Sequence, residues 1–151
     1  MNRLATLARC AAAVLVLSAG LAHADADTQF RQQLGDAFLD HYWSLHADDA
    51  IAMGYYRDAD QLPAPDAKYR ASLQRFLDGS IAQLEKLSAA DMSDGLRTDR
   101  EMLLNQLRYE RWTLDTLREW QWQPSDYNVA DAFSLLLNTP YADEATRLRT
   151  V

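Results

Sequence analysis

The residues best suited to metal chemistry are two histidines, His41 and His46, in a stretch that also carries four aspartates. Five positions along a helix turn a side chain by about 140°, so these imidazoles do not face one ion as an i, i+4 pair does. No H-E-x-x-H motif occurs. A hard-cation site remains an alternative, but a solvated acidic helix end with His41 partly packed is favoured. We predict no metal ligands and no tight zinc binding. The four aspartates are Asp36, Asp40, Asp48 and Asp49.

Groups for nucleophilic or nucleotide chemistry are scarce. The only cysteine is Cys10, no G-x-S-x-G motif occurs, and the glycines after residue 24 are too isolated to form a phosphate loop. The acid pairs Asp58/Asp60 and Asp91/Asp94 have the residue types of a glycosidase, but loops of acidic proteins carry such residues routinely. The sequence therefore predicts no catalytic and no cofactor-binding residues in this chain.

An aromatic cluster near the end of the longest predicted helix is the candidate for binding. Its rings are suited to stacking on a sugar or a peptide, with Asp126 as a polar contact. Packing in a core or against another layer of helices is the favoured alternative. We therefore predict a ligand or interlayer surface. It comprises Tyr109, Trp112, Trp120, Trp122 and Tyr127.

Residues 1–24 have the features of a cleavable export signal. Arg3 and Arg9 form a basic start, an apolar stretch follows, and Ala22-His23-Ala24 is a small-x-small cleavage site. The apolar stretch is about a dozen residues, whereas a spanning helix needs roughly 20. Cys10 stands too early to be a convincing lipid-attachment site. We expect cleavage after Ala24, a periplasmic or secreted protein, and no stable membrane anchor afterwards.

Composition fits a soluble globular domain rather than a disordered or polytopic chain. The 151 residues are 48% hydrophobic and 25% charged, with a net charge of -7. This acidity argues against a nucleic-acid partner. Removing residues 1–24 leaves 151 − 24 = 127 residues, a charge of 13 − 22 = -9 and no cysteine. The mature chain would therefore rely on its apolar core rather than on disulfides.

Apolar residues recur every three or four positions, which predicts an all-α fold. Thr98, with Glu101 three residues later, predicts a capping box, while Gly54 and Pro124 are expected to end helical stretches. We expect an irregular bundle of about four to five helices after the signal peptide. The helical stretches are residues 28–45, a short turn over 48–53, and then 66–87, 98–122, 130–137 and 143–151.

The predicted helix over residues 98–122 carries two apolar stripes, although one is enough for a three-helix bundle. A second stripe indicates another layer, and the last predicted helix has no ending. We therefore expect residues 25–151 to be the N-terminal portion of a larger helical fold, truncated at the C-terminal end. Its partner would be its own missing C-terminal region. Alternatively, the 130–137 helix and the aromatic residues close the gap. One stripe is Leu103, Leu107, Leu114 and Leu117, and the other is Met102, Tyr109, Trp112 and Trp120.

Short motifs over residues 30–151 resemble, in order and spacing, the N-terminal part of the bacterial domain-of-unknown-function family 885. The resemblance implies a long, mostly helical, exported protein related to zinc metallopeptidases, with its His-Glu metal motif far downstream. Zinc and a peptide substrate are thus implied for a full-length protein only. Where the family often has proline, this chain has Asp48-Asp49, which puts the geometry of that turn in doubt. The motifs are Phe38-Leu39-Asp40-His41-Tyr42-Trp43, Ala50-Ile51-Ala52-Met53-Gly54, Leu62-Pro63, Leu87-Ser88, Asp99 with Leu103-Leu104, and Pro124-Ser125-Asp126-Tyr127.

Two functional hypotheses follow from these features. The first is an exported helical segment of a metallopeptidase-like protein, inert by itself because it lacks metal ligands, nucleophile and base. The second is a small periplasmic binding or interaction module that is complete as it stands and uses its aromatic surface. The DNA after the codon for Val151 discriminates between them, since only the first requires a continuing reading frame.

Overall fold

The computed structural model describes residues 25–151, and every regular element among them is helical. The predicted all-α fold is therefore confirmed. The predicted signal peptide and the bond after Ala24 lie outside the described residues. The longer helices are a segment over 25–33, α2 (Asp36–Leu45), α3 (Ala47–Ala52), α4 (Ala67–Glu85), α5 (Asp94–Trp112), α6 (Ala130–Asn138) and α7 (Glu144–Thr150). Short turns are η1 (Ala89–Asp91), η2 (Thr113–Leu117), η3 (Glu119–Gln121) and η4 (Pro124–Tyr127).

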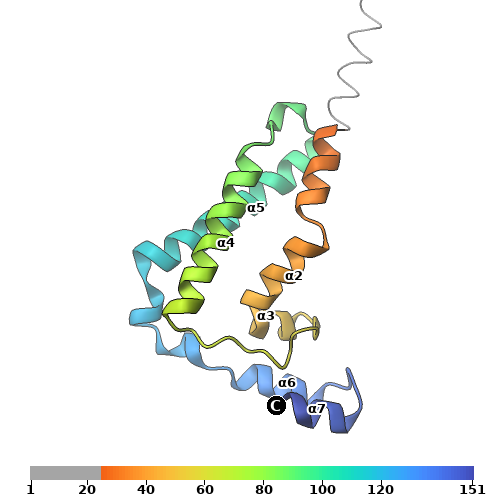
Figure 1. Cartoon of the computed structure of the whole chain (residues 1–151), viewed down its shortest axis with the longest axis vertical. Coiled ribbons are helices and arrows are strands. Elements are labelled where there is room, and N and C mark those ends of the chain that lie inside the picture. Colours follow the sequence, from red (N-terminus) through yellow and green to blue (C-terminus); the bar gives the residue numbers. More distant parts are fainter. Residues whose placement is uncertain (1–24) are drawn as a thin grey trace, which may run out of the picture.

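Helices α4 and α5 form an antiparallel pair, and the 25–33 segment and α2 pack beside it (Figure 1). Helix α4 begins where predicted, because the Asp66 carboxylate accepts a hydrogen bond from the Tyr69 amide at 2.8 Å. Its apolar residues recur every three or four positions and are buried or partly buried in the main core. Buried in this core are Ala26, Phe30, Leu45, Leu73, Phe76, Leu77, Leu84, Leu87, Met92, Leu104 and Leu107.

Polar contacts set the register of the α4–α5 pair. The buried Arg100 donates from Nε to the Leu84 carbonyl at 2.9 Å, so it satisfies a backbone acceptor in the last turn of α4. Further along the pair, Arg111 bonds Asp78 at 2.6 Å. The later residue of α5 thus contacts the earlier residue of α4, which is the register of an antiparallel pair.

A second, smaller core lies at the end of the molecule where α3 meets α6 (Figure 1). It is built from Ile51, Ala59, Ala132 and Leu136. Tyr56 and Tyr141 stack beside it with ring centroids 4.0 Å apart. Gly54 has φ +80°, a left-handed conformation suited to glycine, and it ends α3 as predicted. The loop after Gly54 thus returns to cover α6.

The first predicted helix, residues 28–45, is not continuous. The chain turns at Leu34 and Gly35, and α2 starts afresh with Gly35 as its N-cap residue. The Phe38 amide bonds the Gly35 carbonyl at 2.9 Å, which begins the new helix. Glycine is the weakest ordinary helix former, so the prediction of one helix gave its position too little weight.

The predicted helix over residues 98–122 is wrong at both ends. It begins at Asp94, and Thr98 lies inside it, with its hydroxyl bonded to the Asp94 carbonyl at 3.0 Å. Ser93 is the N-cap residue, and its amide donates to the distant Asp27 carboxylate at 3.0 Å. At the other end, the α-helix stops at Trp112 and η2 is π-helical. Arg118 then adopts the left-handed conformation (φ 53°), which breaks the helix before the expected Pro124.

Candidate functional site

A pocket of about 260 Å³ lies between the first turns of α4, the last turn of α5 and the turns that follow it. We call it the aromatic pocket. His46, at the junction of α2 and α3, and Glu110 of α5 also border it. Most of the surface that the pocket offers belongs to apolar and ring atoms. Its other walls are Pro65, Tyr69, Arg70, Leu73, Tyr109, Thr113, Leu114, Glu119, Trp120 and Tyr127.

The Trp120 wall is held from both sides. Its indole N–H donates to the Leu114 carbonyl at 3.1 Å. The Arg70 guanidinium lies 4.0 Å from the ring centroid in a cation–π contact, and Arg70 also bonds the Pro65 carbonyl at 2.8 Å. These contacts link the entry of α4 to the turns after α5.

Two further members of the predicted aromatic cluster also support the backbone. The π-helical turn and the left-handed residue after α5 leave carbonyl groups without regular helical partners. The Trp122 indole donates to the Leu117 carbonyl at 3.0 Å, and the Tyr127 hydroxyl to the Trp120 carbonyl at 2.6 Å. The polar ends of these residues are therefore already engaged, although their rings remain largely exposed.

A network around Glu110 borders the pocket. The Tyr42 hydroxyl and the Gln106 amide donate to Glu110 Oε1 at 3.1 and 2.9 Å. His46 Nε2 lies 3.5 Å from Oε2, while the opposite ring nitrogen, Nδ1, donates to the Tyr42 carbonyl at 2.9 Å. The side chains of His46 and Glu110 are 14% and 15% exposed. An ion pair with little access to solvent thus joins the α2–α3 junction to α5.

Burial and mutual contact shift the pKa values of this pair in opposite directions. Burial alone would lower the pKa of His46, but the Glu110 carboxylate and the Tyr42 carbonyl outweigh it, so that pKa is raised. Burial alone would raise the pKa of Glu110, but contacts with His46, Gln106 and Tyr42 lower it overall. Nearby, burial raises the pKa of Tyr69 to about 12. Each member of the pair therefore favours the charged form of the other.

The two histidines are not used together. His41 is exposed on α2, with its ring 4.8 Å from the Phe76 ring, whereas His46 is paired with Glu110. Within residues 25–151, no group of three or more His, Cys, Asp or Glu side chains could hold a metal ion. His46 and Glu110 are both titratable groups, but most of the adjoining pocket surface consists of apolar atoms.

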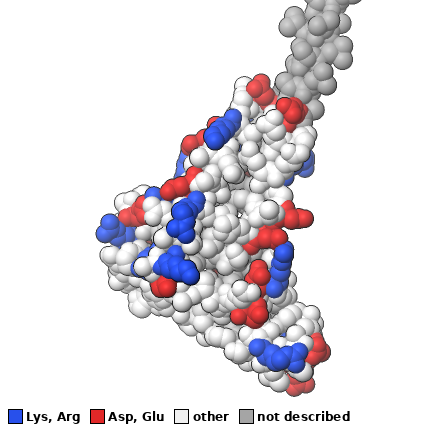
Figure 2. All heavy atoms as spheres, viewed as in Figure 1, with Lys and Arg blue, Asp and Glu red and all other residues white. Residues whose placement is uncertain are grey.

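Three apolar side chains on one side of α5 remain exposed. Met102, Tyr109 and Trp112 are 67%, 55% and 47% exposed, and the rings of Tyr109 and Trp112 lie 6.2 Å apart. We call these three residues the aromatic face of α5. Trp120, predicted to extend this stripe, instead forms a wall of the pocket, because the helix ends before it. The lower edge of the molecule, toward α6, also shows a largely uncharged area (Figure 2).

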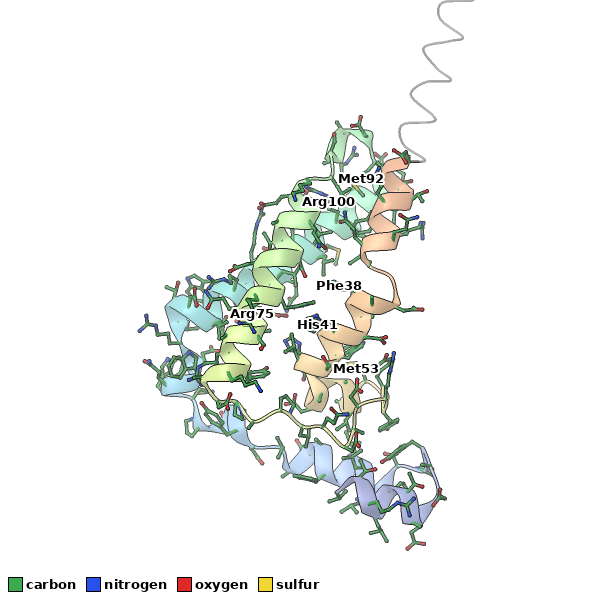
Figure 3. All side chains as sticks on the ribbon, in the orientation of Figure 1. Phe38, His41, Met53, Arg75, Met92 and Arg100 are labelled. Atoms are coloured by element: carbon green, nitrogen blue, oxygen red, sulfur yellow. The ribbon has the colours of Figure 1, made fainter. Side chains whose placement is uncertain are left out.

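A larger hollow of about 530 Å³ lies between α2 and α4. Phe38 and His41 lie on the side of α2 that borders it, and Arg75 approaches from α4 (Figure 3). The Arg75 guanidinium bonds the Ser72 hydroxyl at 3.0 Å. The lining mixes polar and apolar groups, whereas that of the aromatic pocket is mainly apolar.

The structure brings together only part of the predicted aromatic set. Tyr109, Trp120 and Tyr127 border the pocket, whereas Trp112 and Trp122 lie outside it. Sequence reasoning missed Glu110 and the pairing of His46 with it, because 64 positions separate them. A local signal existed only for the contact between Tyr42 and His46. These residues have i, i+4 spacing, and their ring centroids lie 4.3 Å apart.

Comparisons with known proteins give one informative match. No family model matches the chain, and no curated protein matches it. A solved structure from Shewanella oneidensis, described as "a putative lipoprotein of unknown function", is similar to this chain with a TM-score of 0.73 and 29% identity. The match covers 80% of this chain and 22% of that one, so this chain spans about a fifth of its length. Among the described residues, no helix is long and apolar enough to cross a membrane.

Proposed function

We propose that this chain is the N-terminal helical region of a longer exported, envelope-associated protein, in which it forms a non-catalytic layer. The similar solved structure supports this, because its matched region is 22% of a much longer chain that is described as a lipoprotein. The proposal places the protein in the periplasm or outside the cell. It does not require a lipid anchor on this chain.

The observation that carries the proposal is the aromatic face of α5. Met102, Tyr109 and Trp112 recur at helical spacing, and no other helix of the described chain buries them. Fully burying a side chain of this size is worth on the order of 1.5–3 kcal/mol, so a partner surface would gain substantially by covering all three. A further helical layer with its own apolar stripe meets that requirement.

The chemistry of the longer protein would reside outside this region. The resemblance to the domain-of-unknown-function family 885 assigns zinc and peptide hydrolysis to a downstream His-Glu motif. The arrangement described above supplies a scaffold instead, in which the Glu110 carboxylate is committed to Tyr42, Gln106 and His46. We therefore assign this region a structural role beside a metallopeptidase-like unit.

The test compares the chain with the product of the same reading frame continued past Val151. Hydroxyl-radical oxidation should attack Met102 and Trp112 readily in the chain. In the longer protein, Met102 should fall to the low reactivity of the buried Met92, while Met53, 75% exposed, stays reactive as an internal control. A stop codon directly after Val151, or a Met102 that oxidises equally in both proteins, would contradict the proposal.

A further inference from the structure

We infer that the aromatic pocket receives one apolar side chain, a ring or a branched aliphatic group, from the layer that covers α5. The inference rests on the proposed function, and it adds the anchor point of that interface. Tyr109 connects the two sites, because it belongs both to the aromatic face of α5 and to the pocket wall. A helix lying on that face would therefore pass the mouth of the pocket.

The chemistry of the pocket selects an apolar occupant. The oxygen atoms Glu110 Oε2 and Thr113 Oγ1 border the site but are sealed from solvent, so an occupant does not reach them directly. Most of the surface it meets is apolar and includes Leu73, Leu114 and Trp120, while Arg70 and Glu119 are the charged residues of the wall. Against the apolar walls a charged or strongly polar group would lose hydration, whereas a hydrocarbon group gains from leaving water.

The size and rigidity of the pocket fit a single side chain. Its volume of about 260 Å³ exceeds the roughly 150 Å³ of a protein cavity that holds benzene. Its Trp120 wall is fixed by the Leu114 carbonyl and by Arg70, and Tyr127 is fixed by its own hydrogen bond to the Trp120 carbonyl. Because these walls are already fixed, little conformational entropy is lost when a side chain binds. The anchor pockets of protein interfaces share this property.

The first experiment adds toluene to the chain and follows the methyl signals of Leu73 and Leu114 by NMR. We expect saturable shifts at both residues. Replacing Leu114 with Phe fills the pocket and should weaken toluene binding about tenfold. Should that variant fail to fold, Trp120→Ala removes one wall and should have an effect of similar size. The control Met53→Ala changes an exposed side chain outside the pocket and should bind toluene as the parent chain does. Unsaturable shifts, or binding that the pocket variants leave unchanged, would overturn the inference.

The second experiment repeats the titration on the longer protein and measures oxidation of Trp112 in parallel. A filled pocket predicts that toluene no longer shifts Leu73 and Leu114. If Trp112 becomes protected while toluene still binds, the layer covers α5 without entering the pocket, and this inference fails while the proposed function stands. If Trp112 stays reactive in the longer protein, the proposed function fails, and the anchor fails with it.

Discussion

At the scale of single residues, the His46–Glu110 pair is the feature with the clearest chemical consequence. The raised pKa of His46 stabilises the fold below that residue's ordinary value of 6.5, and this contribution is lost as pH rises through the raised pKa. The lowered pKa of Glu110 stabilises the fold above its ordinary value of 4.5, and this contribution is lost as pH falls. The pair therefore contributes most between these two values.

The corresponding prediction concerns the variant Glu110→Gln. It should lose the extra stability that the pair contributes between pH 4.5 and 6.5, relative to more acidic and more basic pH, and should return the pKa of His46 toward or below 6.5. Urea melts across this range and NMR titration of His46 measure both effects. Glu85→Gln is the matched control, since Glu85 forms an exposed ion pair with Arg108 that contributes little. Parallel pH profiles for the two variants would rule out the proposed role of the pair.

At the scale of elements, α4 positions Tyr69 and Arg70 at the pocket through its N-cap. Replacing Asp66 with Ala removes the acceptor of the Tyr69 amide and should lower the free energy of unfolding by about 1 kcal/mol. The contact between Arg70 and Trp120 should also loosen, changing the tryptophan fluorescence. Asp60→Ala, in the exposed part of the preceding loop, controls for the loss of a charge. Equal effects of the two changes would show that the cap is unimportant.

The elements also show what could be predicted from the sequence. The apolar spacing of α4 is a local signal, and it predicted that helix closely, whereas the Asp66 cap was not predicted. At the start of α5 the Ser93 amide bonds Asp27, 66 positions earlier, and the turn after α5 is followed by the left-handed Arg118. Neither is a local pattern. For the same reason, the aromatic residues were recognised from the sequence, but the carbonyl groups that Trp120, Trp122 and Tyr127 satisfy were not.

At the scale of the whole molecule, the two cores differ in size, and we expect them to differ in stability. The smaller core has four buried members against eleven in the main core. Leu136→Ala, at a fully buried site, should cost the smaller core about 2–5 kcal/mol. Hydrogen exchange should then accelerate in α3 and α6 while α4 and α5 keep their protection. Uniform acceleration throughout the chain would instead indicate a single cooperative unit.

The claim central to this account is that the aromatic face of α5 is an uncovered docking surface rather than part of the chain's own core. The most direct measurement combines sedimentation with urea melts of residues 25–151, with and without Trp112→Ser. Because Trp112 is 47% exposed, the substitution should reduce self-association while helicity hardly changes and the free energy of unfolding falls by less than about 1 kcal/mol. A chain that is monomeric, melts in one sharp transition and loses roughly 3–5 kcal/mol on the substitution would contradict the account, since that is the behaviour of a buried core tryptophan.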